Sequence, residues 1–223
     1  MCRHAVPAIW LYPERECDAD VELEFQGNGF MTVSTPPYQA KWRIQIDPAI
    51  PYARYRERYG FQSHHEFLDY DGLREGPYQL TNGWCIRQRD FMAWQRDVLP
   101  KCGFSESEIE SAVYYYGRML MDNKYPGDYV TIYPQDTTIV EQSVKLRVAP
   151  LPDTVMRMWF YLNFSSVAQK VNKPDIPSFT RRGFVVVEMG FLTRRDVPQL
   201  RLRSSNHHLA FGLLPHWVDK TRF

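Results

Sequence analysis

The stretch Asp20-Val21-Glu22-Leu23-Glu24-Phe25 decides the fold class, because acidic and apolar residues alternate in it without a break. A period of two residues puts the apolar side chains on one face of a β-strand and the acids on the other. The same alternation recurs in Lys41–Asp47 and, with a polar interruption at Gln142, in Val140–Val148. These segments predict strands that each bury one face.

The neighbouring segments extend this pattern into a mainly β fold. Further strands are expected at 6–12, 30–35, 65–71, 83–88, 129–134, 155–163 and 184–192. The capping-box sequence Ser105–Glu108 predicts a helix that ends near Asn123, and a shorter helix is expected from about Phe91 to Leu99, with Asp90 as its N-cap. Because strands and helices do not alternate, the sequence predicts an α+β fold, mainly β: an antiparallel β-sandwich or open barrel with an αα insertion at about 90–123.

The chain is expected to form one β-rich domain over 1–192, followed by a C-terminal extension over 193–223. Neither half of the strand region carries an obvious core of its own. The extension has four arginines near its start and an apolar stretch at 209–214. It could be an arm, a terminal strand or a lid, and it is a candidate surface for a homo-oligomer.

Composition and motifs exclude several classes of function. Lys and Arg number 27 and Asp and Glu 26, so the net charge of +1 disfavours nucleic-acid binding. No apolar stretch of membrane-spanning length and no secretory signal occur, and the four cysteines are widely spaced, so we expect a cytoplasmic protein with free thiols and no membrane partner. The sequence also lacks a glycine-rich nucleotide motif and metal-binding spacing of histidines, so neither a cofactor nor a metal is expected.

Glu188 is the most conspicuous candidate for chemistry. It interrupts the apolar run Phe184–Leu192, which is typical of a strand buried on both faces. A carboxyl group in such surroundings can have a raised pKa and act as a general acid or base. Arg157 interrupts a second apolar segment, so the two residues could instead form a structural ion pair. Plain solvent exposure of Glu188 is the third possibility.

Asp69 and Asp71 are two residues apart and would share one face of a strand. Paired acids could perform acid/base chemistry or bind a hard cation, or they could form a solvated strand face.

Aromatic residues make up 15% of the chain and supply candidate ligand contacts. The three tyrosines at 114–116 would span about 200° of a helix, so at least one should line a cleft or the surface. A tyrosine-lined pocket suits a flat organic molecule or a sugar ring. The candidate binding residues are Tyr70, Tyr115, Tyr116, Trp84 and Trp159.

Several segments resemble a family of uncharacterised proteins. Pro7–Glu14 resembles its opening Lys-Pro-x-Ile-Tyr-Leu-Tyr-Pro-Glu segment, Leu68–Gly72 resembles its Leu-Phe-Trp-Glu-Gly segment, and Arg182–Glu188 resembles its Arg-x-Gly-Phe-Thr-Val-Val-Glu strand. The resemblance covers about residues 7–192 and implies a shared fold, but no activity. Met189 and Phe191 depart from the family pattern beside Glu188.

The sequence leaves three functions open, the last of which is a structural subunit that docks a partner through residues 193–223. The first is a cofactor-independent isomerase, cyclase or lyase acting on an apolar or aromatic metabolite. In it Asp71 and Glu188 would be acid and base, and Arg157 would steady developing negative charge. The alternative is a non-catalytic β-sandwich module that binds a carbohydrate or a protein.

Overall fold

The fold is described from a computed structural model of the whole chain. The structure describes residues 3–5, 7–50, 55–57, 64–118, 120, 125–176 and 179–194. Apart from its first two residues, the predicted C-terminal extension lies outside this part, so the expectations for it stay predictions.

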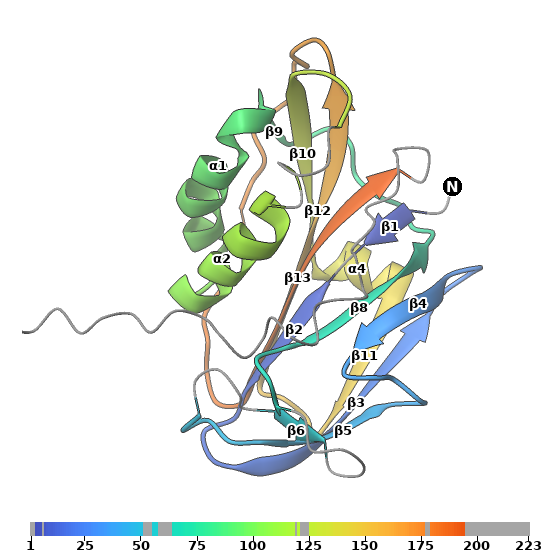
Figure 1. Cartoon of the computed structure of the whole chain (residues 1–223), viewed down its shortest axis with the longest axis vertical. Helices are drawn as coiled ribbons and strands as arrows, with labels where there is room; N and C mark the ends of the chain where they lie inside the picture. Colours follow the sequence, from blue (N-terminus) through green and yellow to red (C-terminus); the bar gives the residue numbers. More distant parts are fainter. Residues whose placement is uncertain are drawn as a thin grey trace, which may run out of the picture.

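The described strands form two sheets (Figure 1). The larger sheet has the order β1-β8-β2-β13-β12-β10-β9, with β4 also paired to β8. Its strands are β1 (Arg3–Ala5), β2 (Ala8–Tyr12), β4 (Phe30–Thr35), β8 (Leu68–Arg74), β9 (Trp84–Arg87), β10 (Tyr129–Gln135), β12 (Thr154–Ser165) and β13 (Val185–Arg194). The smaller sheet has the order β11-β3-β5-β6-β7. Its strands are β3 (Cys17–Phe25), β5 (Trp42–Ile46), β6 (Tyr55–Glu57), β7 (His64–His65) and β11 (Val144–Ala149).

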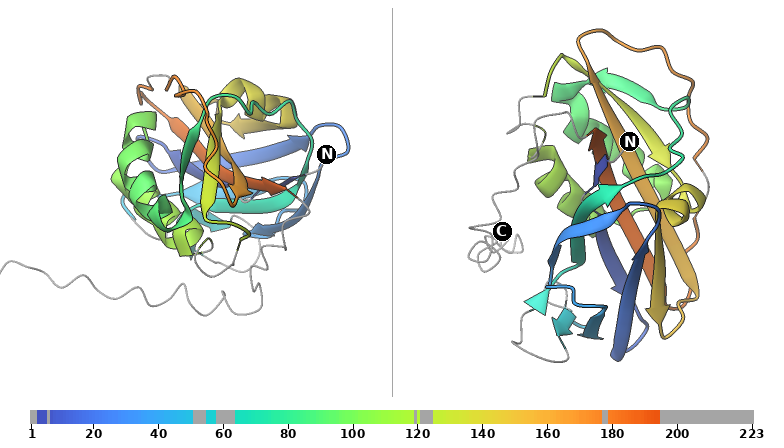
Figure 2. Two further views of the ribbon diagram at one scale, coloured as in Figure 1. Left: turned by 90° about the horizontal axis from the view of Figure 1, so that it is seen from above. Right: turned by 90° about the vertical axis from the view of Figure 1, so that its right-hand side faces the viewer.

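The two sheets and a pair of helices form three layers (Figure 2). One apolar core lies between the sheets and includes Ile9 and Val186 of the larger sheet and Val21 and Ile44 of the smaller one. A second core lies between the larger sheet and the helices α1 (Phe91–Val98) and α2 (Glu106–Ala112). The predicted α+β, mainly β sandwich with an αα insertion is confirmed, and the pairings between its described strands are antiparallel except for the parallel pair β12–β13.

The central strand β13 is buried on both faces, which explains its nearly continuous apolar sequence. Val187 and Met189 point to the helix-side core, whereas Val186 and Leu192 point between the sheets. Because side chains alternate along a strand, Glu188 lies on the same face as Val186, between the two sheets.

One predicted strand is partly wrong. Residues 140–143 belong to the helix α4 (Thr137–Ser143), and the strand β11 begins only at Val144. The carboxylate of Asp136 accepts a hydrogen bond from the backbone N–H of Ile139 at 3.0 Å and so caps the helix. Val140 and Val144 are four residues apart, so they fit a helical face as well as an alternating strand.

The two helices of the insertion begin where the sequence predicts, α1 at Phe91 and α2 directly after Ser105. Asp90, however, makes no side-chain cap, because it ends a short 3-10 turn that leads into α1. A second 3-10 turn, Leu99–Cys102, follows α1. Gly103 ends it with a φ of 91°, a left-handed conformation that suits glycine. After α2 the helix widens into a π-helical turn at Val113–Gly117. The predicted end near Asn123 lies outside the described residues.

The capping box of α2 gives a direct test of local stability. Ser105 Oγ accepts a hydrogen bond from the N–H of Glu108, whose carboxylate accepts one from the N–H of Ser105 at 2.8 Å. We expect Ser105→Ala to lower the free energy of unfolding by about 1 kcal/mol in urea denaturation. Ser107→Ala removes a hydroxyl that contacts the Ser105 Oγ at 3.2 Å but caps no backbone N–H, so it should change the free energy of unfolding by less than about 0.5 kcal/mol. Equal effects of the two substitutions would argue against the cap.

In the part of the chain that the structure describes, no helix has the length and apolar character needed to cross a membrane.

Candidate functional site

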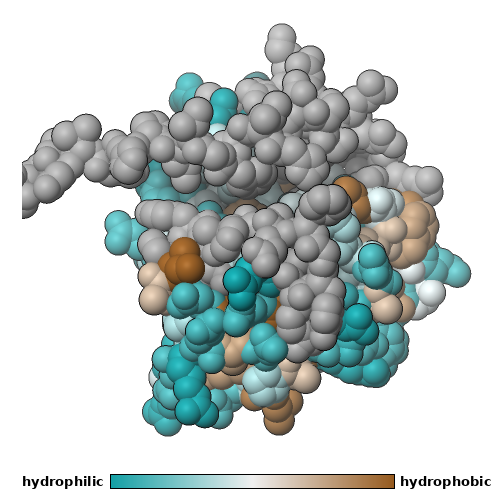
Figure 3. Space-filling model, turned by 60° about the horizontal axis from the view of Figure 1, so that its bottom comes forward, coloured by the Kyte–Doolittle hydropathy of each residue, from teal (hydrophilic) through white to brown (hydrophobic). Residues whose placement is uncertain are grey.

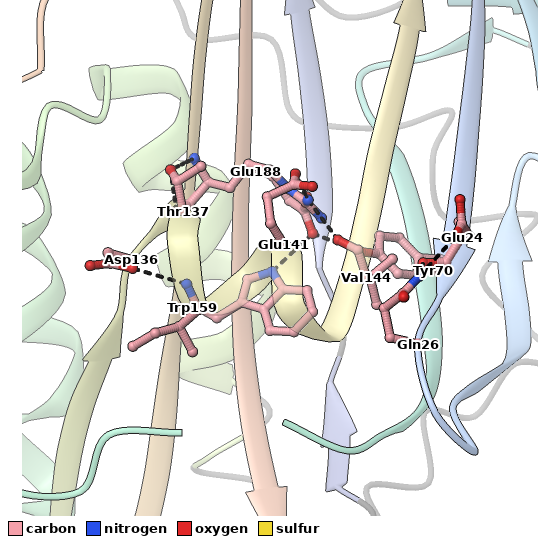
Figure 4. A network of polar contacts seen from close by, with 11 residues as sticks. Glu24, Gln26, Tyr70, Asp136, Thr137, Glu141, Val144, Trp159 and Glu188 are labelled. Carbon is pink, nitrogen blue, oxygen red and sulfur yellow. Dashed lines mark hydrogen bonds and ion pairs between the residues drawn. The ribbon is translucent and has the colours of Figure 1, made fainter. Parts of the chain in front are cut away.

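Glu188 is the centre of a buried polar network between the two sheets (Figure 4). Its Oε1 accepts hydrogen bonds from the hydroxyl of Tyr70 at 2.7 Å and from Nε1 of Trp159 at 2.9 Å. Its Oε2 accepts one from Nε of Arg157 at 2.6 Å. All four side chains are buried, and Glu188 itself is 0% exposed. Three donors therefore satisfy a carboxylate that has no contact with solvent, as a charge held inside a protein requires.

Strand register explains why this acid meets this arginine. β12 and β13 run parallel, and Arg157 lies directly opposite Glu188. Trp159 lies two residues further along β12, on the same face. Tyr70 reaches the same carboxylate from β8. The ion pair between Arg157 and Glu188, one of the interpretations of the sequence, is therefore present.

Arg157 continues the network towards the surface. Its Nη1 donates to the carbonyl oxygen of Val144 at 2.7 Å and forms an ion pair with the carboxylate of Glu141. The side chain of Glu141 is 39% exposed. Burial alone would lower the pKa of Arg157, but the nearby carboxylates, Glu188 above all, hold that pKa above its usual range. The network thus joins a buried acid to a partly exposed one through a single guanidinium group.

A second buried arginine packs beside the network. The guanidinium carbon of Arg74 lies 4.7 Å from the ring centroid of Tyr70, 5.0 Å from that of Trp159 and 5.2 Å from that of Phe25. A cation over aromatic faces is stabilised by their electron density. Tyr70 and Trp159 therefore serve two partners at once, Glu188 through their polar atoms and Arg74 through their rings. Burial raises the pKa of the Tyr70 hydroxyl, and the negative charge of Glu188 raises it further.

An open hollow of about 670 Å³ lies at the outer end of the network, and we name it the α4 hollow. Six polar side chains line it: Gln26, Thr137, Thr138, Glu141, Gln142 and Lys145. Two more contacts hold its rim, since Glu24 accepts a hydrogen bond from Gln26 Nε2 at 3.0 Å and pairs with Lys145 Nζ at 3.3 Å. The hydrogen bond from Gln26 and the contact with Lys145 lower the pKa of Glu24.

Asp71 does not join this network. In β8, Leu68 and Tyr70 point into the core between the sheets. Asp71 follows Tyr70 directly, so its side chain points to the opposite face of the larger sheet. Its Oδ1 accepts a hydrogen bond from the N–H of Gly72 at 2.6 Å. The structure therefore separates Asp71 from Glu188, and the pairing of these two acids across one pocket is not formed.

The remaining aromatic candidates are spread over the helix side of the larger sheet. Tyr116 is 5% exposed and packs on Phe191, with ring centroids 4.5 Å apart. Tyr115 is partly buried and packs edge-on against Phe67 at 5.5 Å. Trp84 packs against Trp94 at 5.4 Å, on the strand β9. Tyr114 is 44% exposed, so the prediction that the three tyrosines cannot all face inward is confirmed.

Asp69, which shares a strand face with Asp71, is an acid whose pKa is clearly shifted. Burial raises the pKa of Asp69 to about 6, and the negative charge of Asp71 contributes to the rise. Burial raises the pKa of Tyr115 and of Tyr116 as well, and Asp69 is among the charges that add to both shifts. In the part of the chain that the structure describes, no group of three or more metal-ligating side chains forms around this or any other acid.

The raised pKa of Asp69 makes stability depend on pH. The carboxyl titrates near 3.8 when unperturbed and at about 6 in the folded protein, so between these values the folded protein binds more protons and stability falls as pH rises. We expect Asp69→Asn, which cannot ionise, to be more stable than the wild type by up to about 3 kcal/mol at pH 7. This advantage should vanish below about pH 4. Urea unfolding at several pH values measures it, with the exposed Asp128→Asn as control; parallel profiles for wild type and Asp69→Asn would contradict it.

Sequence reasoning missed the residues of the α4 hollow and the role of Arg74. Glu141 and Gln142 were assigned to a strand, so nothing indicated that they would face a hollow. Arg74 lies four residues after Tyr70 with the same parity, so an extension of the predicted strand from 71 to 74 would have placed both on one face.

Comparison of the chain with family models, with curated proteins and with solved structures gives no match. The resemblance carried by Pro7–Glu14 and Arg182–Glu188 stays a prediction.

Proposed function

We propose that the chain is a non-catalytic binding module and that it binds a hydroxyl-rich small molecule, such as the end of a carbohydrate, in the α4 hollow. The observation that carries this proposal is the lining of the hollow, in which hydroxyl, amide, carboxylate and ammonium groups stand among the aliphatic parts of the same six side chains. Such groups donate and accept hydrogen bonds in the way that a sugar's hydroxyls require.

The environment of Glu188 supports a binding function over the catalysis expected of this residue. A general acid or base must come within hydrogen-bond reach of the proton that it transfers. Glu188 is 0% exposed, and Tyr70, Trp159 and Arg157 already occupy its two oxygens. The network is best explained as the internal support of β12 and α4, which in turn shape the hollow.

Exposed aromatic side chains give less support for a binding surface. Among the described residues, Phe30 and Tyr114 are the exposed aromatic ones, at 51% and 44%, and they lie on different elements. Figure 3 shows apolar side chains scattered among hydrophilic ones on the described part of one face. The α4 hollow, which gathers six hydrogen-bonding side chains at one place, is therefore the better candidate.

A panel of D-glucose, D-galactose and D-mannose tests the proposal by calorimetry and ligand-observed NMR. Thr138 is exposed and lines the hollow, so Thr138→Val removes one hydroxyl with little effect on folding. We expect at least one sugar to bind the wild type, and Thr138→Val to weaken it about fivefold, the worth of one hydrogen bond. Thr32→Val, an exposed threonine on β4, is the control and should bind normally. Failure of all three sugars, or equal binding by Thr138→Val, would refute the assignment.

A second candidate function keeps the acid/base chemistry and moves it to Asp69. Its pKa of about 6 suits proton transfer near neutral pH, and Tyr115 and Tyr116 of the π-helical turn lie within electrostatic range. π-helical turns occur frequently at functional sites. An isomerase, cyclase or lyase of this kind would need no cofactor.

Solvent exchange distinguishes this enzyme from the binding module. A base that removes a proton from carbon introduces deuterium from D₂O into a ketone or enol substrate. If Asp69 is that base, the wild type should label members of a panel of aromatic and alicyclic ketones, and Asp69→Asn should not. Equal labelling by both proteins, or none by either, would remove this candidate. The cytoplasmic location and the homo-oligomer stay predictions.

A further inference from the structure

The three nitrogen atoms of the Arg157 guanidinium group donate different numbers of hydrogen bonds. Nε is taken by Glu188, and Nη1 donates to both Glu141 and the carbonyl oxygen of Val144. Nη2 is buried and has no hydrogen-bond partner among the described residues. A buried N–H group of a cation without an acceptor costs free energy, so the outer end of this side chain can take a further acceptor.

Glu141 contacts this end through a single oxygen, Oε1, and among the described residues Arg157 is the one hydrogen-bond partner of its side chain. It projects from the short helix α4, its side chain is 39% exposed, and it lines the α4 hollow. Arg157 and Glu188 balance each other's charge, so moving Glu141 into solvent leaves no net charge buried. Breaking a fully buried pair is costly, but departure of this outer carboxylate leaves the pair between Arg157 and Glu188 intact.

We propose that the Glu141 carboxylate occupies the position at Arg157 that a ligand's carboxylate takes on binding, and that the α4 hollow therefore binds a sugar acid. The ligand carboxylate replaces Glu141 at Arg157 and accepts hydrogen bonds from both Nη1 and Nη2, where Glu141 uses one nitrogen. A carboxylate held by two nitrogens of an arginine is favoured in both energy and geometry. This inference deepens the proposed function and rests on it, because it names the ligand class of the same hollow.

The rest of the hollow suits such a ligand. Thr138 and Gln142 line it beside Glu141 and can bond to the hydroxyl groups of the ligand. Lys145 also lines it and is 47% exposed, and its ammonium group adds a positive charge to the lining that Glu24, at 3.3 Å, partly balances. A hydroxyl-rich molecule with one carboxylate combines both features.

Removing the internal carboxylate provides the test. D-Glucuronate, D-glucose and acetate are titrated into the full-length wild type, Glu141→Ala and the control Glu106→Ala, which removes an exposed acid from α2. Affinity is measured by calorimetry, and the Nε–Hε signal of Arg157 is followed by NMR. We expect Glu141→Ala to bind D-glucuronate about tenfold more tightly than the wild type, because the competing carboxylate is gone. D-Glucose has no carboxylate, so it should gain no affinity from Glu141→Ala.

The probes separate the two proposals. Acetate needs no hydroxyl contacts, so it should shift the Arg157 signal in Glu141→Ala more strongly than in the wild type or in Glu106→Ala. If acetate leaves this signal unmoved, or if D-glucuronate binds Glu141→Ala no more tightly than the wild type, the carboxylate inference is wrong even where D-glucose binds. If acetate moves the signal and no sugar binds the wild type or the variant, the proposed carbohydrate function fails and the ligand is a simpler carboxylate.

Discussion

Replacement of Arg157 by alanine is expected to lower the free energy of unfolding by about 3–5 kcal/mol, because it leaves the buried carboxylate of Glu188 without its cation. Tyr70 and Trp159 would still donate hydrogen bonds to Glu188, but both are neutral groups. A neutral donor compensates a buried charge less well than a guanidinium group does. Urea denaturation, followed by tryptophan fluorescence and by circular dichroism, measures the loss.

A double substitution supplies the control for this prediction. Arg157→Met with Glu188→Gln removes both charges and roughly keeps the volume, so it should be clearly more stable than Arg157→Ala. Glu141→Gln, at the exposed end of the network, should cost less than about 1 kcal/mol. A single Arg157→Ala variant as stable as the wild type would show that Glu188 does not depend on this partner.

Replacement of Trp159 by alanine is the second substitution with a large expected effect. The side chain is 0% exposed, packs between the sheets and supports Arg74 with its ring. Truncating a buried tryptophan costs about 3–5 kcal/mol from lost burial and the cavity that remains. The loss of the N–H donor to Glu188 adds to this.

Trp159→Phe separates the two contributions. It keeps an aromatic ring and removes the donor, so it should cost about 1–2 kcal/mol, less than the alanine variant. Trp84→Phe, at a partly buried tryptophan of β9, should cost less still. If Trp159→Phe destabilises the protein as much as Trp159→Ala, hydrogen bonding to Glu188 and not packing dominates at this position.

The sheets could largely be predicted from the sequence because each strand buries at least one face. The alternating stretch 20–25 lies within β3 (Cys17–Phe25), and the apolar run at 184–192 matches β13 (Val185–Arg194). The strand prediction for residues 140–143 was wrong because the spacing of Val140 and Val144 fits both a helix and a strand. The cap that Asp136 provides favours the helix. The order of the strands could not be predicted from the sequence, because the parallel pairing of β12 with β13 depends on contacts between residues far apart in the chain.

The candidate site was predictable in part. Glu188 and Arg157 each stood out as a charge in an apolar run, and the structure brings them together. Tyr70 and Asp71 were assigned to one site although adjacent residues of a strand point to opposite faces, so this part of the prediction conflicted with its own geometry. The α4 hollow could not be predicted, because it depends on a helix that the sequence pattern hides.

Sugar binding by two variants shows whether the ligand enters the α4 hollow while Glu188 supports the sheets from within. The affinity of Glu188→Gln and of Thr138→Val for the sugars of the panel is compared with that of the wild type, after circular dichroism has shown both variants to be folded. We expect Glu188→Gln to keep the affinity within about twofold and Thr138→Val to lose about fivefold. The reverse result, a loss in Glu188→Gln and none in Thr138→Val, would contradict this expectation and return Glu188 to the functional site.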